Sequence, residues 1–204
     1  MKINKIPIII MFAAFQFVPS ISGEPKHSPE NAVLLATQQL FEVAKSNEAL
    51  LSVNPEKFYD LIIKNLEAST DFEGFAKGVM AKYYRLATED QRRNFAEKFK
   101  VSLSRTYSKA LLDFDGDSVT VKSSEIERID RAKVLVEVKS SSGVTYPIIY
   151  SLRLTEGRWY LRNLVVNGIN LGLQFRSQFN SSFRLHKGDL DTVIKEWKVT
   201  NENS

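Results

Sequence analysis

The period of the hydrophobic residues changes twice along this chain, and the two changes indicate its fold class. From residue 33 to residue 111, apolar residues recur every three to four positions, which is the spacing of one face of an α-helix. From residue 118 to residue 166 they alternate with polar residues, as in a β-strand with one buried face. The helical spacing returns after Asn167-Gly168. Helices, then strands, then helices predict an α+β domain.

The first three expected helices begin at residues that favour helix starts. Ser28 and Asn54 each precede a Pro-Glu pair, and both side chains are suited to cap the helix that follows. Asp71 is expected to cap the third helix, whose apolar face runs from Phe72 to Tyr83.

The fourth helix has the clearest pattern in the chain. Thr88 and Gln91 have the spacing of a capping box at its start. Apolar residues then recur at every fourth position: Phe95, Phe99, Leu103, Tyr107 and Leu111. The acidic, glycine-containing run at residues 113–117 is expected to form a turn that ends this helix.

A meander of short antiparallel strands is expected next, with one apolar face. The strands cover residues 118–122, 133–139, 146–154 and 159–166. A fifth helix is expected to place its apolar face on Leu171, Phe175, Phe179 and Phe183. A final helix is expected to begin at Asp189.

The N-terminus has the organisation of a secretory signal peptide. Lys2 and Lys5 precede a mainly apolar run of 13 residues, from Ile6 to Val18, and a segment with proline and small residues follows it. A membrane-spanning helix needs about 20 apolar residues, so this run is too short for an anchor. We expect residues 1–23 to be removed, which leaves one domain over residues 24–204.

Composition argues against several functions. The chain has 28 Lys and Arg against 24 Asp and Glu, a balance too even for the basic face that nucleic acid requires. Cysteine is absent, and His27 and His186 are the only histidines. Metal-ligand spacings are therefore missing, and a Ser-His-Asp arrangement has little support. We expect no metal site and no catalytic residue.

Two alternatives remain open from the residues themselves. The chain has 13 Phe, 7 Tyr and 2 Trp, and their stripes suit either the filled core of a structural adaptor or the lining of a cavity. A carboxylate base in an apolar pocket would instead suit an enzyme with a small hydrophobic substrate. Asp71, Glu73 and Asp130 are candidates, but each has a simpler role as a cap, a first-turn acid or a turn residue.

Two blocks of this sequence carry a distinctive combination of motifs. The first runs from Asp71 to Leu112 and includes Asp-Phe-Glu, Lys-Tyr-Tyr-Arg-Leu-Ala and the aromatic repeat of the fourth helix. The second runs from Trp159 to Phe179 and includes Val-Val-Asn-Gly-Ile-Asn-Leu followed by Arg-Ser-Gln-Phe. Together they resemble the MlaC family of periplasmic phospholipid-binding proteins. The sequence departs from the family at Asn163 and Asn167, where members often carry acids, and at Ala81, where glycine is common.

The resemblance implies a fold, a cargo and partners. The fold would be NTF2-like, with N-terminal helices on a curved antiparallel sheet, C-terminal helices, and an apolar cavity between helices and sheet. The cargo would be a glycerophospholipid, bound by a periplasmic monomer that is not an enzyme and needs no cofactor. The partners would be an inner-membrane ABC transporter complex with an MCE-domain subunit and an outer-membrane lipoprotein–porin complex. Shuttling between them would maintain the lipid asymmetry of the outer membrane.

The resemblance and the apolar stripes together suggest which residues contact the lipid. Two acyl chains would require a cavity on the order of 1,000 Å³. The expected lining residues are Phe72, Val79, Tyr83, Leu103, Tyr107, Leu111, Ile148, Tyr150, Leu152, Trp159, Val165, Leu171 and Phe175. Arginine in place of Tyr150 or Val165 is expected to empty the pocket.

Overall fold

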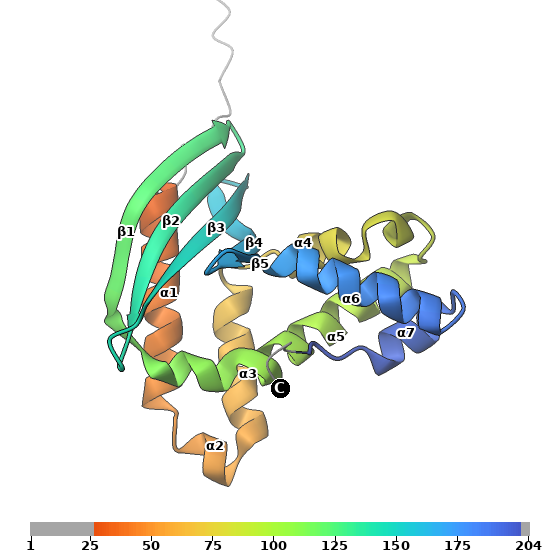
Figure 1. Ribbon diagram of the computed structural model, residues 1–204, viewed down its shortest axis with the longest axis horizontal. Helices are drawn as coiled ribbons and strands as arrows, with labels where there is room; N and C mark the ends of the chain where they lie inside the picture. Colours follow the sequence, from red (N-terminus) through yellow and green to blue (C-terminus); the bar gives the residue numbers. More distant parts are fainter. Residues whose placement is uncertain (1–26, 201–204) are drawn as a thin grey trace, which may run out of the picture.

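The computed structural model describes residues 27–200, apart from the side chains of residues 115–117, and confirms the α+β arrangement (Figure 1). The expected signal peptide, residues 1–23, lies outside the described residues. The helices are α1 Pro29–Ser46, α2 Leu50–Val53, α3 Pro55–Glu67, α4 Phe72–Met80, α5 Glu89–Tyr107, α6 Leu171–Leu185 and α7 Leu190–Glu196, with 3₁₀ helices η1 Ala81–Arg85 and η2 Ser108–Asp113. The strands are β1 Phe114–Arg128, β2 Arg131–Ser140, β3 Thr145–Thr155, β4 Arg158–Val166 and β5 Ile169–Asn170.

The five strands form one curved antiparallel sheet in the order β1-β2-β3-β4-β5 (Figure 1). Two-residue turns connect β3 to β4 and β4 to β5. Their residues all have positive φ, 50° and 72° at Glu156-Gly157 and 48° and 82° at Asn167-Gly168. This conformation matches the twist of an antiparallel hairpin and favours Asn and Gly.

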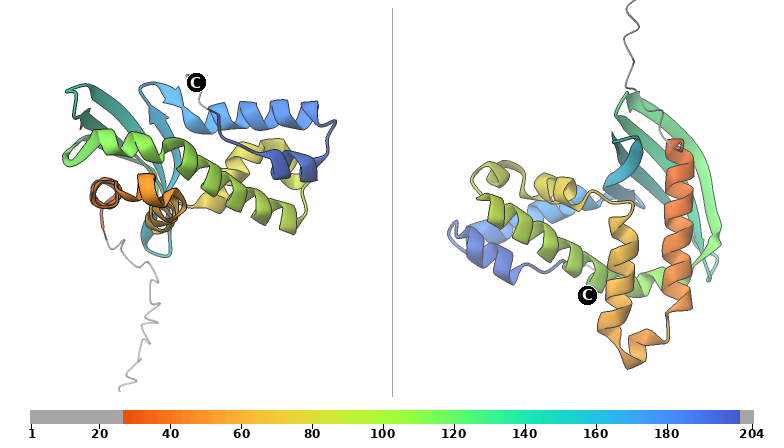
Figure 2. Two further views of the ribbon diagram at one scale, coloured as in Figure 1. Left: turned by 90° about the horizontal axis from the view of Figure 1, so that it is seen from below. Right: turned by 180° about the vertical axis from the view of Figure 1, so that it is seen from behind.

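Helix α1 packs lengthwise on one face of the sheet, which we call the inner face (Figure 2, right). Along β2, buried and more exposed residues alternate because successive side chains of a strand point to opposite faces. The buried set on β2 is Ala132, Val134, Val136 and Val138. Val33 and Phe41 of α1 join this set in one hydrophobic cluster.

Helices α4, α5, α6 and α7 form a second body beside the sheet, with an aromatic core of its own (Figures 1 and 2). Phe95, Phe99, Phe175 and Phe179 are fully buried there. The capping box of Thr88 and Gln91 is present at the start of α5, as expected. The sequence pattern for this helix is therefore confirmed at its N-terminus and along its buried face.

A short segment before α4 joins the two bodies. Residues 69–71 run beside β4, where the Asp71 amide donates to the Leu161 carbonyl at 3.0 Å and the Leu161 amide donates to the Ser69 carbonyl at 2.8 Å. Asp71 caps α4, as expected, by accepting from the Gly74 amide at 2.7 Å. Its second carboxylate oxygen pairs with Arg162 of β4 at 2.5 Å. The start of α4 is thereby fixed to the sheet.

Two helices end earlier than their apolar stripes suggested. The α-helical part of α4 ends at Met80, because Ala81 has a φ of 49°, and Tyr83 lies in the 3₁₀ helix η1. Helix α5 ends at Tyr107, and Leu111 lies in η2. In both places the chain tightens into a 3₁₀ helix, as is common at helix ends.

The expected acidic turn at residues 113–117 is wrong. Strand β1 begins at Phe114 and continues to Arg128, well beyond the expected strand at 118–122. Phe114 pairs with Ser140 of β2, and its ring stacks on Phe41 of α1 at 5.4 Å between centroids. These tertiary contacts override the local preference of Asp and Gly for turns. Helix α2 and strand β5 were not expected.

A β-bulge in β4 changes which of its residues face α1. Ser151 pairs with Asn163, but Leu152 pairs with Leu161, so Arg162 is the extra residue. Beyond the bulge, Leu164 lies opposite Tyr150 and Val165 lies opposite Ile149. Because paired residues share a face, Leu164 is on the inner face with Tyr150, and the expected inward placement of Val165 is wrong.

Candidate functional site

The candidate site is a cavity between α1, the end of α3 and the inner face of the sheet. Its volume is about 90 Å³. Most of its lining is aliphatic or aromatic, with polar groups at a few positions. The lining residues are Ala32, Val33, Ala36, Thr37, Leu40, Leu66, Ser69, Thr70, Tyr150, Leu152, Trp159, Leu161 and Leu164.

The helical period of α1 places one side of the helix on this cavity. Ser28 caps the helix by accepting from the Asn31 amide at 3.3 Å, with Pro29 at the first position. Val33, Thr37 and Leu40 follow at intervals of three and four, so they share a face. Ala32 and Ala36 flank that face, and both also belong to the cavity lining. Their small side chains leave room between α1 and the sheet.

The polar side chains of the cavity form two hydrogen bonds, one of them from Ser69 Oγ to the Leu66 carbonyl at 3.4 Å, and leave two groups unpaired. The hydroxyl groups of Thr37 and Tyr150 lie 3.0 Å apart, linking α1 to β3. Thr70 Oγ1 and Trp159 Nε1 are buried and have no hydrogen-bond partner among the described residues. Burial raises the pKa of the Tyr150 phenol above its ordinary value, and the hydrogen bond with Thr37 opposes that shift. Tyr150 is therefore neutral at physiological pH.

A surface groove of about 370 Å³ adjoins the cavity. The groove and the cavity share Ala32, Ala36, Ser69 and Trp159, so these residues lie where the two spaces meet. The other groove residues are more polar: they include His27, Gln39, Asn65 and Arg158. The groove is therefore more polar than the cavity that it adjoins, and we take it as the mouth of the cavity.

Arg158 has a defined position at this mouth. One guanidinium nitrogen donates to the Ala68 carbonyl at 3.1 Å, and the group lies over the Tyr160 ring, 5.5 Å from its centroid. No acidic side chain in the described residues pairs with it. An arginine held in this way presents free N–H groups to an anion such as a phosphate.

The structure brings only part of the expected site together. Tyr150, Leu152 and Trp159 line the cavity, and Leu111 and Ile148 pack in the same cluster on the inner face. The rest of the expected helical residues belong to the second body, whose core is separate from the sheet cluster. These are Phe72, Val79, Tyr83 and Phe175, which are buried, and Leu103, Tyr107 and Leu171, which pack on them.

Several lining residues were missed, for different reasons. Val33, Leu40 and Leu66 belong to the helical stripes of α1 and α3, so their burial was predictable but their partner surface was not. Leu164 was missed because the bulge at Arg162 shifts the alternation of β4. Thr37 and Thr70 carry no sequence signal that distinguishes them from surface threonines.

The cavity is much smaller than the volume expected for two acyl chains. A space of about 90 Å³ compares with an expectation on the order of 1,000 Å³. The expected size is therefore wrong for this conformation. The physical reason is close packing, because α1 lies directly on the inner face over β1 and β2.

Two other kinds of feature are absent from residues 27–200. No group of three or more His, Asp or Glu side chains within residues 27–200 could hold a metal ion. Among the same residues, no helix combines the length and the apolar character needed to cross a membrane. No carboxylate lines the cavity.

Comparison with known proteins places this geometry in context. Residues 35–199 match the family model described as MlaC protein. The toluene tolerance protein ttg2D of Pseudomonas putida is 34% identical over 191 residues, which cover 93% of this chain and 87% of that protein. The intermembrane phospholipid transport system binding protein MlaC of Haemophilus influenzae is 20% identical over 168 residues, covering 80% of this chain and 78% of that protein.

A solved structure supports the fold independently. A phospholipid-binding protein from Ralstonia solanacearum, solved in complex with a phospholipid, superposes with a TM-score of 0.71. The match covers 83% of this chain and 98% of that protein at 19% identity. At this level of identity the likeness concerns the fold.

Proposed function

The chain belongs to the MlaC family, and from this premise we propose that it carries a glycerophospholipid whose acyl tails enter the cavity between α1, α3 and the sheet. The observation that carries the proposal is the apolar cavity with a polar mouth. This arrangement matches the two halves of a phospholipid. The bound lipid is cargo, and the protein needs no cofactor.

The energetics explain why a carrier with such a cavity is useful. Each CH₂ group removed from water contributes about 0.8 kcal/mol, so a 16-carbon tail contributes roughly 12 kcal/mol. A phospholipid therefore does not cross an aqueous compartment unaided at a useful rate. Because the tails supply most of the binding energy, the cavity can remain apolar and tolerate different headgroups.

Loading requires the cavity to widen. The Thr37–Tyr150 hydrogen bond joins α1 to β3 across the cavity, so it is one contact that opening must break or stretch. A net contribution of about 0.5–1.5 kcal/mol for such a bond is small compared with the energy of burying two tails. We propose that the lipid separates α1 from the inner face as it enters.

The headgroup is proposed to lie in the groove that forms the mouth. Arg158 is the cationic side chain of this groove, and its guanidinium is already oriented by Ala68 and Tyr160. A phosphodiester at the mouth would receive charge-assisted hydrogen bonds from it. The unpaired donors Trp159 Nε1 and Thr70 Oγ1 lie deeper, where ester carbonyls of the lipid would supply acceptors.

The cellular role follows from the family. We propose that the protein works in the periplasm and exchanges lipid with two membrane complexes. These are the inner-membrane ABC transporter complex with an MCE-domain subunit and the outer-membrane lipoprotein–porin complex. The Haemophilus influenzae relative is named as the binding protein of an intermembrane phospholipid transport system, which supports this role. Maintenance of outer-membrane lipid asymmetry is the proposed outcome, and no bond is made or broken in the cargo.

One observation favours a second candidate. The small cavity volume is what a non-enzymatic adaptor with a filled core would show. An NTF2-like enzyme has no comparable support, because no carboxylate lines the cavity to act as a base.

Transfer of a phospholipid between vesicles separates the two candidates. Donor vesicles carry a self-quenched fluorescent phosphatidylglycerol, acceptor vesicles carry none, and a porous membrane keeps the two apart. A carrier moves the labelled lipid to the acceptor at a rate proportional to protein concentration. An adaptor with a filled core leaves the rate at that of the buffer alone, and this result would reject the carrier proposal.

A further inference from the structure

A second groove lies on the body formed by α4 to α7. Its residues belong to other helices than those of the cavity mouth, and the two sites share no residue. The second groove runs between α5 on one side and α7 with the segment 197–199 on the other, with a volume of about 320 Å³. A shallower hollow of about 360 Å³ continues it and shares Lys98, Val101 and Lys195 with it. Together they extend along α5 from Asn94 to Thr106, which is about 18 Å at 1.5 Å per residue.

The walls of this groove carry four cations. Lys98 and Arg105 come from α5, Lys195 comes from α7, and Lys198 comes from the segment that follows it. Arg105 pairs with Glu56 at 2.5 Å, whereas the three lysines have no acidic partner among residues 27–200. Such a concentration of unpaired charge on facing walls favours an anionic occupant.

The one carboxylate in the lining does not neutralise these cations. Glu97 pairs with Lys100 at 2.7 Å. Lys100 also pairs with Glu67 of α3 at 2.5 Å, so this pair lies on the side of α5 that faces α3. The groove lining thus has three lysines without an acidic partner in the described part of the chain, and its one carboxylate is paired with Lys100 outside the lining.

The floor of the groove is apolar and its far wall is held in place. Val101, Ile194, Trp197 and Val199 contribute to the lining, and the last three are buried. The Val199 amide donates to Ser102 Oγ at 2.5 Å, and Thr106 Oγ1 donates to the Val199 carbonyl at 3.1 Å. These two bonds attach the segment 197–199 to α5, so the groove is formed before anything binds.

Trp197 links the groove to the interior of the second body. It lines the groove, and its ring packs on Phe95 and Phe179 of the aromatic core, with 5.2 Å and 5.8 Å between the ring centroids. The groove is therefore built directly on a rigid core.

From these observations we propose that the groove between α5 and α7 is a docking site for an extended acidic segment of a partner protein. Carboxylates of the segment pair with the lysines on both walls, and its aliphatic side chains lie on the floor. The groove is elongated along α5 and has cations on both sides, which suits an extended segment better than a single headgroup. No residue of this groove lines the cavity mouth, so a docked partner leaves the mouth free for lipid exchange.

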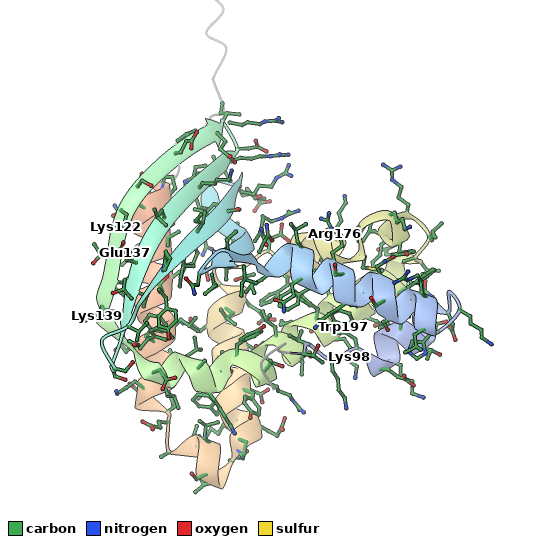
Figure 3. All side chains as sticks on the ribbon, in the orientation of Figure 1. Lys98, Lys122, Glu137, Lys139, Arg176 and Trp197 are labelled. Atoms are coloured by element: carbon green, nitrogen blue, oxygen red, sulfur yellow. The ribbon has the colours of Figure 1, made fainter. Side chains whose placement is uncertain are left out.

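The test uses a defined probe and a matched control variant. The probe is a fluorescein-labelled peptide of eight residues with alternating glutamate and leucine, and binding to the full chain is followed by fluorescence anisotropy. The variants are Lys98→Glu, Lys195→Glu and, as control, Lys139→Glu on the outer face of the sheet. Figure 3 shows Lys98 on α5 and Lys139 on the sheet, on separate bodies of the molecule. Each substitution changes the net charge equally, and Lys139 also lacks an ion-pair partner within residues 27–200.

The expected result is specific to the groove. Lys98→Glu and Lys195→Glu each weaken the peptide about tenfold, Lys139→Glu changes it by less than twofold, and added salt weakens the wild type. Equal weakening by all three substitutions would overturn the proposal in favour of non-specific attraction. Absence of peptide binding would overturn it as well. Binding to anionic phosphatidylglycerol vesicles that is lost on Lys98→Glu, without peptide binding, would replace the partner segment by a membrane surface.

Discussion

The guanidinium group of Arg162 occupies the space that a side chain at Gly74 would need. An ideal Cβ at residue 74 would overlap the Arg162 guanidinium, which pairs with Asp71 at 2.5 Å and donates to the Gly74 carbonyl at 3.2 Å. The first turn of α4 thus packs closely on β4 because residue 74 has no side chain. This contact attaches the helical body to the strand whose bulge shapes the cavity.

Substitution of this glycine tests the contact, and α4 supplies its own control. Gly78 lies one turn later, and a Cβ there would meet nothing within 4 Å. Gly78→Ala should therefore stabilise the protein by about 0.5–1 kcal/mol, the usual gain from Ala over Gly in a helix. Gly74→Ala should be less stable than Gly78→Ala by about 1–2 kcal/mol, because Arg162 must leave Asp71. Urea denaturation measures both, and equal effects would contradict the account.

Ala81 offers a stabilising substitution. Its φ of 49° with a ψ of −119° is a conformation that glycine adopts without strain and alanine does not. Ala81→Gly should raise the free energy of unfolding by about 1–2 kcal/mol, after the greater chain entropy of glycine is subtracted. Thermal unfolding followed by circular dichroism measures the shift. An unchanged or lower midpoint would show that the turn after α4 is not strained.

The bulge in β4 predicts opposite results for two neighbouring residues. Leu164 lines the cavity and Val165 lies on the other face of the strand. Leu164→Arg should abolish uptake of a fluorescent phospholipid, because a charged group would enter the apolar space. Val165→Arg should retain it. Circular dichroism must first show that both variants are folded, and lipid loss in Val165→Arg alone would contradict the assignment.

Removing the hydroxyl group of Tyr150 should destabilise the protein at neutral pH. Thr37 is buried, with 4% of its surface exposed. In Tyr150→Phe its hydroxyl would lose its hydrogen-bond partner. A buried hydroxyl without a partner costs about 1–3 kcal/mol. The double variant with Thr37→Val should lose less than the sum of the two single variants, because it leaves neither group unpaired. Strict additivity in urea denaturation would show that the two hydroxyls do not interact.

The same pair predicts a pH dependence at alkaline pH. Burial raises the pKa of Tyr150 in the folded state above its unfolded value of about 10, so folding favours the protonated phenol. This contribution is fully present below about pH 10 and is lost as the pH rises through the folded pKa. Tyr150→Phe lacks that loss, so its stability deficit relative to the wild type should shrink as the pH rises above about 10. A constant deficit would contradict the burial of the phenol.

Local sequence signals were sufficient for most of the helices and for the order of the elements. Ser28, Asn54, Asp71 and the Thr88–Gln91 pair all cap helices where their residue types suggested. These signals work because a helix start depends on residues within one turn of it. Helix ends were less predictable, as the early endings after Met80 and Tyr107 show.

The candidate site depended on information that is not local. Nothing in the sequence near Phe114 shows that Phe41 and β2 would extend β1 through an acidic run. The bulge at Arg162 moves Leu164 inward, and the Arg162 side chain pairs with Asp71, which is distant in the sequence. Apolar stripes predicted burial, but they could not assign Phe175 to one core and Leu152 to another.

The most direct test of the central claim is the mass of the folded protein with whatever it has bound. The protein is isolated from a periplasmic extract without detergent and examined by native mass spectrometry, followed by solvent extraction of the same sample. The account predicts one diacyl phospholipid per chain, released when the protein is denatured. Protein that carries no phospholipid, and takes up none when mixed with phospholipid vesicles, would contradict it.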